Sequence, residues 1–156
     1  NKPLTIQGDV TLLLTSTGSA ISISGNAGIT LAAGSSLIIY TAGDISIAGN
    51  GVANPNLPEK FQIWGTKTTG TQSIGIAGNG TLSGIVYAPQ GSVTINGNGD
   101  VCGSVVANDI TPTGNASFHY DEALADFGGD NPYRVSKWTE LTTATDRAAY
   151  NTLMSF

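Results

Sequence analysis

Apolar and polar residues alternate in short runs along most of the first 118 residues. The clearest runs upstream are 4–6, 10–12, 29–31, 37–39 and 61–64, and many of their apolar members are β-branched. This period of two predicts short strands that each turn one face to a core. Between the last two runs, Val52 to Lys60 contains Pro55 and Pro58, so we expect this segment to be a loop that leaves the strands.

A seven-residue phrase recurs through the same region. Its copies are Ile21-Ser-Ile-Ser-Gly-Asn-Ala27, Ile45-Ser-Ile-Ala-Gly-Asn-Gly51, Ile74-Gly-Ile-Ala-Gly-Asn-Gly80, Val93-Thr-Ile-Asn-Gly-Asn-Gly99 and Ile110-Thr-Pro-Thr-Gly-Asn-Ala116. Consecutive copies start between 17 and 29 residues apart, close to the length of one turn of a solenoid. Each copy is interpreted as a strand with inward apolar residues, followed by a sharp bend at glycine.

Two longer segments repeat together with the phrase. Leu82, Gly84, Val86 and Ala88 align with Val101, Gly103, Val105 and Ala107. Paired repeats of this kind predict an all-β, single-stranded, right-handed parallel β-helix, or β-solenoid. Stacked turns would also bring one asparagine of each phrase into a column, in which side-chain amides bond to the next turn. The members of this structural turn ladder are Asn26, Asn50, Asn79, Asn98 and Asn115.

The pattern changes near residue 119, so we predict a β-solenoid over residues 1–118 and a capping tail over 119–156. The stretch from Asp121 to Asp126 is typical of a short helical turn, and residues 146–154 of a two-turn helix. Such a partly helical cap protects the last strand edges of a solenoid. The side chains expected to anchor it are Phe118, His119, Tyr120 and Trp138.

Several motifs together resemble an uncharacterised bacterial β-helical domain. They are Phe61-Gln-Ile-Trp-Gly65, the Gly-Asn-Gly turns, Gly84-Ile-Val-Tyr-Ala-Pro89 and Phe118-His-Tyr-Asp-Glu-Ala-Leu124, followed by Tyr133-Arg-Val and Trp138-Thr-Glu-Leu141. The resemblance covers about residues 57–141. It implies a place at the C-terminal end of PilX-like pilus-assembly proteins, behind a pilin-like membrane helix. In architecture alone, the repeats are also similar to bactofilins, whose β-helices polymerise end to end.

Charge and composition exclude some functions. The net charge is −5, and only 6 Lys and Arg residues are scattered along the chain, so we expect no nucleic-acid partner. No apolar run approaches the ~20 residues of a spanning helix, so we expect no transmembrane segment in this chain. Cys102 is the single cysteine, which we interpret as a small core residue.

The residues that carry chemistry are few. His119 is the only histidine and lies two residues before Asp121, but no activated nucleophile accompanies them, so no catalytic residue and no cofactor are predicted. A cluster of acidic residues in the tail is a weak candidate for Ca²⁺, because calcium prefers oxygen ligands. Its members are Asp121, Glu122, Asp126 and Asp130.

The predicted function is therefore a non-catalytic structural module of the cell surface, a pilus or an extracellular filament, assembling head to tail. Its partners would be other copies of itself or pilus and surface proteins. The alternative is a carbohydrate- or surface-binding adhesin module, with Trp64 and Tyr87 as outward aromatic contacts to a glycan. A polysaccharide-active enzyme and an ice-binding protein rank lower, because paired carboxylates and recurring threonine arrays are not apparent.

Overall fold

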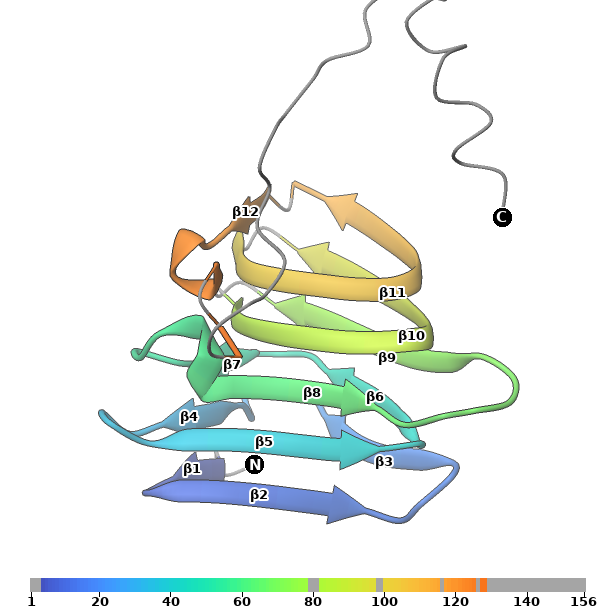
Figure 1. The fold of residues 1–156 in the computed structure, drawn as a ribbon, viewed down its shortest axis with the longest axis horizontal. Coiled ribbons are helices and arrows are strands. Elements are labelled where there is room, and N and C mark those ends of the chain that lie inside the picture. The colour runs from blue at the N-terminus through green and yellow to red at the C-terminus, as the bar shows by residue number, and fades with distance from the viewer. Residues whose placement is uncertain (1–3, 79–81, 98–99, 116, 126, 129–156) are drawn as a thin grey trace, which may run out of the picture.

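The strands of the chain stack as successive turns of a parallel β-solenoid (Figure 1). The structure is a computed structural model, and it describes residues 4–78, 82–97, 100–115, 117–125 and 127–128. Every strand pairing within it is parallel, as in β2 with β5 and β5 with β8. The predicted all-β solenoid fold is thus confirmed.

Three faces make up the solenoid. The first face consists of β1 (Leu4–Ile6), β4 (Ile29–Leu31) and β7 (Val52–Ala53). The second face contains β2 (Asp9–Leu14), β5 (Ser36–Thr41), β8 (Phe61–Gly65), the first half of β10 (Leu82–Gly97), the first half of β11 (Asp100–Gly114), and β12 (Ser117–Tyr120). The third face contains β3 (Ser19–Ile23), β6 (Asp44–Ile47) and β9 (Gln72–Gly78), followed by the second halves of β10 and β11.

The strand register follows the sequence repeats. The first residues of the five phrases stack on the third face in the order Ile21, Ile45, Ile74, Val93 and Ile110. On the second face, β10 and β11 pair Leu82 with Val101, Gly84 with Gly103, Val86 with Val105 and Ala88 with Ala107. Both alignments predicted from the sequence are confirmed, because a repeat with the same inward residues can stack only in that register.

The core runs along the solenoid axis and consists mainly of isoleucine, leucine and valine. Side chains in its middle, such as Leu37, Ile39, Ile63 and Ile74, are fully buried. Phe61 is also fully buried, and it occupies the space beside Gly84, where a Cβ would lie 2.6 Å from its Cδ1 atom. One bulky side chain is thus accommodated by a glycine in the next turn, as close packing requires.

The segment from Val52 to Lys60 differs in part from the prediction. Its first two residues form β7 and pair with β4, so they continue the first face instead of leaving it. Only the following residues leave the stack, and they return through a 3₁₀ turn, η1 (Pro58–Lys60), which contacts β10. The prolines begin at Pro55, so the restriction that proline places on strands applies only after β7.

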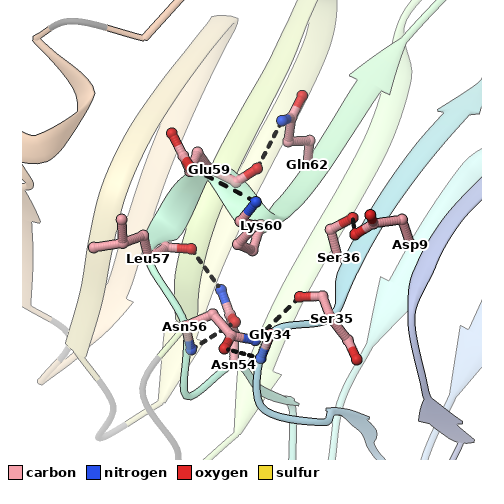
Figure 2. A network of polar contacts seen from close by, with 10 residues as sticks. All are labelled: Asp9, Gly34, Ser35, Ser36, Asn54, Asn56, Leu57, Glu59, Lys60 and Gln62. Carbon is pink, nitrogen blue, oxygen red and sulfur yellow. Dashed lines mark hydrogen bonds and ion pairs between the residues drawn. The ribbon is translucent and has the colours of Figure 1, made fainter.

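Asparagine side chains fasten this loop to the solenoid (Figure 2). The Asn56 side chain accepts a hydrogen bond from the Gly34 amide (2.8 Å) and donates to the carbonyls of Ala32 (3.0 Å) and Ser35 (3.1 Å). Asn54 Nδ2 donates to Ser83 O (3.0 Å) on β10. The loop is therefore bonded to the turn below it and to the strand above it.

The predicted helical cap is not shown. In the tail, the described residues contain one 3₁₀ turn, η2 (Glu122–Leu124), which begins where Asp121 accepts a hydrogen bond from the Ala123 amide (2.9 Å). Leu124 is buried, and η2 contacts η1. The predicted helix at residues 146–154 lies outside the described residues.

Candidate functional site

Three aromatic side chains form a column on the outside of the second face. Tyr40 on β5 pairs in register with Trp64 on β8, and Trp64 pairs with Tyr87 on β10. These three residues are called the aromatic column here. Leu13 on β2 and Val106 on β11 extend it at either end, and both are exposed. The result is an apolar stripe parallel to the solenoid axis.

The rings of the aromatic column overlap one another. The ring centroids of Tyr40 and Trp64 are 6.2 Å apart with an interplanar angle of 22°, and those of Trp64 and Tyr87 are 5.2 Å apart at 46°. These distances fall in the range of offset aromatic pairs. Trp64 is also held from the side, because its Nε1 donates to Gln62 Oε1 (2.8 Å) and Gln62 Nε2 donates to Glu59 O (2.7 Å).

This overlap changes what the predicted contacts, Trp64 and Tyr87, can offer to a ligand. A sugar ring stacks on the open face of an aromatic ring, whereas each ring here covers part of its neighbour. Trp64 lies between two rings and is only half-exposed, while Tyr87 at the end of the stack is 40% exposed. The column thus connects three adjacent turns, and its most exposed side chain is Tyr87.

The second candidate surface is the end of the solenoid formed by β1, β2 and β3, which we call the N-terminal end. Its inward side chains Val10, Leu12, Leu14, Ile21 and Ile23 are only half-buried. In the next turn, the residues paired with them in the same columns are at most 2% exposed. A cavity of about 280 Å³ lies beside these side chains, with an almost wholly apolar lining. The core is therefore open toward this end among the described residues.

Main-chain groups of the N-terminal end also point away from the stack. Gly8 O accepts a hydrogen bond from Ser36 N (3.1 Å), and Ile23 O accepts one from Ala48 N (2.9 Å). Because successive residues of a strand direct their backbone groups to opposite sides, the amides of Thr11, Leu13 and Ser22 face outward along the axis. This end thus combines free strand edges with an exposed apolar centre, which is the chemistry of a strand-pairing surface.

Cys102 lies in a different position from the one predicted. It follows inward Val101 on β11, so its side chain is on the outer face, and it is half-exposed. Its register partners are Ser83 on β10 and His119 on β12. The prediction of a core cysteine was wrong because Val101 and Gly103 occupy the inward positions on either side of it.

The residues predicted to anchor the tail, and the acidic residues predicted as weak calcium ligands, are only partly among the described residues. Phe118 and Tyr120 lie on β12 above Val101 and Gly103, and both are more than half exposed. Among the described residues of the tail, the buried apolar side chain is Leu124, which the sequence reasoning did not name as an anchor. In the described part of the chain, no three His, Cys, Asp or Glu side chains gather to hold a metal ion. Trp138, Asp126 and Asp130 lie outside the described residues.

Three members of the predicted asparagine ladder, Asn26, Asn50 and Asn115, lie among the described residues. Asn50 Nδ2 donates to the main-chain oxygen of Asn26 (3.0 Å), whereas at Asn115 it is the main-chain N–H that donates, to Gly97 O (3.1 Å). Both bonds therefore end on main-chain carbonyls. Asn79 and Asn98 lie outside the described residues. The sharp bends of positive φ are at glycines such as Gly25 and Gly49, because no described residue other than glycine has a positive φ.

Sequence reasoning also missed Tyr40, the third member of the aromatic column. The signal was present, because Tyr40 directly follows the apolar run 37–39, at the position that corresponds to Trp64 after Phe61–Ile63. None of the described helices is long and apolar enough to cross a membrane.

These features define the class of protein as a parallel β-solenoid with an outer aromatic column and an open N-terminal end. Residues 3–127 match a family described as a domain of unknown function (DUF7305), and the chain belongs to this family. The match begins far upstream of residue 57, where the resemblance noted in the sequence began. Comparisons with curated proteins and with solved structures found no match.

Proposed function

We propose that this domain is a non-catalytic structural module of the cell surface, a pilus or an extracellular filament. In this role, a right-handed solenoid acts as a stiff spacer and its N-terminal end joins it to another subunit. The resemblance to the C-terminal domains of PilX-like pilus-assembly proteins supports this location. Of the partners predicted from the sequence, which were other copies of the chain and pilus or surface proteins, this proposal takes other copies of the chain.

The observation that carries the proposal is the open N-terminal end. Half-buried Leu12, Leu14 and Ile23 lie beside a cavity of about 280 Å³, and burying such side chains stabilises association by about 25 cal/mol per Å² of apolar surface. Outward amides on β2 and β3 need hydrogen-bond partners that another strand edge supplies. An end with both features is suited to contact with a second β-structure.

Self-association over a concentration series tests this function directly. We expect sedimentation velocity to show a larger species at higher concentration, and negative-stain electron microscopy to show particles longer than one solenoid. A chain that remains monomeric at every concentration, with no elongated particles, would contradict a joining function for this end.

A second candidate function is surface or glycan binding at the aromatic column. The apolar stripe from Leu13 through Tyr40, Trp64 and Tyr87 to Val106 supports it, since exposed apolar patches mark interaction sites. We expect binding to an insoluble neutral polysaccharide to be weakened by Tyr87→Ala, which removes the exposed terminal ring. Gln90→Ala, at an exposed position near the same strand's bend, is the control, and equal retention of both variants would contradict this candidate.

A further inference from the structure

We propose that the N-terminal end binds the same end of a second copy, so that two solenoids meet head to head about a two-fold axis. This inference rests on the proposed joining function and identifies the partner. It also replaces the predicted head-to-tail contact with a closed, symmetric one. An interface of this type is formed by the same surface on both subunits.

Backbone geometry allows this pairing on the second face. The backbone amides of Thr11 and Leu13 point out of the stack, whereas the backbone amide and carbonyl of Leu12, between them, face β5. When two copies of β2 run antiparallel with Leu12 opposite Leu12, Thr11 of each copy lies opposite Leu13 of the other. Outward amides then meet outward carbonyls in hydrogen-bonded pairs, and the two Leu12 residues form a non-hydrogen-bonded pair.

The remaining strands of the end fit the same axis. A two-fold axis through the middle of the second face exchanges the first and third faces, so β1 of one copy meets β3 of the other. Ile6 O accepts from Ala32 N (2.9 Å) and Ile23 O accepts from Ala48 N, so Thr5 and Ser22 carry the outward backbone groups. Both have exposed side chains, and the two strands therefore pair without turning a core residue outward.

Side-chain chemistry agrees with the backbone. In this register, inward Val10 faces inward Leu14 of the other copy, and the leucines close the apolar cavity from both sides. Asp9 is the only acidic residue on β1, β2 and β3. In this register it lies opposite Thr15 of the other copy, and the two Asp9 side chains do not face each other. The joint thus buries apolar surface and brings no like charges directly together.

The opposite end of the solenoid is a poorer match. Its uppermost strand on the second face is β12, with four residues. This edge is shorter than that of β2, which has six residues, whereas the head-to-head contact pairs β2 with its full-length copy.

A mixing experiment separates the two kinds of joint. Thr11→Pro removes an outward amide of β2 without removing a bond to β5, because proline is tolerated on the free side of an edge strand. Leu13→Lys places a charge at the same edge and serves as a second variant. Phe118→Lys alters the opposite end. Circular dichroism establishes that each variant is folded, and native mass spectrometry of one labelled and one unlabelled variant identifies the copies in each dimer.

Head-to-head joining predicts that Phe118→Lys dimerises like the wild type, and that association stops at the dimer. Thr11→Pro and Leu13→Lys would each raise the dissociation constant about tenfold or more, because each symmetric joint loses its edge bonds twice. If neither Thr11→Pro nor Phe118→Lys self-associates but their mixture forms a heterodimer, the joint is head to tail: this inference fails and the joining function stands. If the wild type stays monomeric, both fail.

Discussion

Phe61 and Gly84 illustrate how single residues set the packing of adjacent turns. A Cβ at Gly84 would approach the Phe61 Cδ1 atom to 2.6 Å and its carbonyl oxygen to 2.9 Å. We expect Gly84→Ala to lower the free energy of unfolding by about 1–3 kcal/mol, since overpacking forces the ring or the strand to move. Urea unfolding measures this change.

Gly18 provides the matched control for that substitution. A Cβ there has no neighbour within 4 Å, and the residue has no positive φ. Gly18→Ala should be neutral or stabilising by up to about 1 kcal/mol, because alanine restricts the unfolded chain. Equal losses in both variants would show that close approach at Gly84 is not the cause.

Gln72 is a polar residue inside the solenoid, and it is 1% exposed. Its Nε2 donates to the carbonyls of Thr41 (2.9 Å) and Gly43 (2.8 Å) in the turn below. Gln72→Leu would leave the buried Gly43 carbonyl without a donor, while the Thr41 carbonyl would keep its bond from Thr66 N (2.8 Å). We therefore expect a loss of about 1–3 kcal/mol in unfolding free energy. Thermal unfolding measures this loss. The control is Gln90→Leu, a substitution at an exposed position that should change the unfolding free energy by less than about 0.5 kcal/mol. A Gln72→Leu variant as stable as this control would refute the role of the two bonds.

At this scale the sequence predicted core residues better than buried polar ones. Alternation identified Ile45, Ile74 and Val93 as inward, because side chains at every second position of a strand lie on one face, and an apolar face turns to the core. Gln72 was not predicted, because its burial depends on two carbonyls that only the stacked turn below brings within reach. Cys102 was assigned to the core because free cysteines are usually buried and its neighbours are small or apolar. Those neighbours occupy the inward positions of the strand, so Cys102 between them points outward.

At the scale of elements, the loop between β7 and β8 depends on Asn56. Its side chain makes three hydrogen bonds to the main chain of residues 32–35, which belong to the preceding turn of the solenoid. We expect Asn56→Ala to free this loop, lowering stability by about 1–3 kcal/mol and speeding proteolytic cleavage within residues 54–60. Mass spectrometry of a limited digest identifies the cut. Asn108→Ala, at an exposed position on β11, is the control, and similar digestion of the two variants would contradict this role.

The repeated phrases predicted the register of β6, β9, β10 and β11 because the same inward residues recur in them. They did not predict β7, since its two residues precede a proline-rich loop and carry no periodic pattern of their own. The aromatic column was predicted in part for a similar reason. Trp64 and Tyr87 lie in recognisable motifs, but their overlap with Tyr40 follows from strand register, which the upstream runs define only loosely.

For the whole molecule, burial increases from the N-terminal end toward the middle turns. The inward residues of β2 and β3 are half-buried, whereas those of β5, β6 and β8 are almost completely buried. In a solenoid, each turn is stabilised mainly by its neighbours, so the first turn is the least stable part of this series. A second copy at this end would supply a further neighbour for the strands of this turn.

Hydrogen exchange detects this stabilisation residue by residue. In the isolated chain, the Thr11 and Leu13 amides face away from the stack and should exchange rapidly, while the Leu12 amide is bonded to β5 and should exchange slowly. Raising the protein concentration should slow exchange at Thr11 and Leu13, because the joint pairs both amides, and should affect Leu12 much less. The Thr11→Pro variant should show no such dependence at Leu13. Exchange at Leu13 that is independent of concentration in the wild type would contradict pairing at this edge, because no other contact proposed for the chain covers that amide.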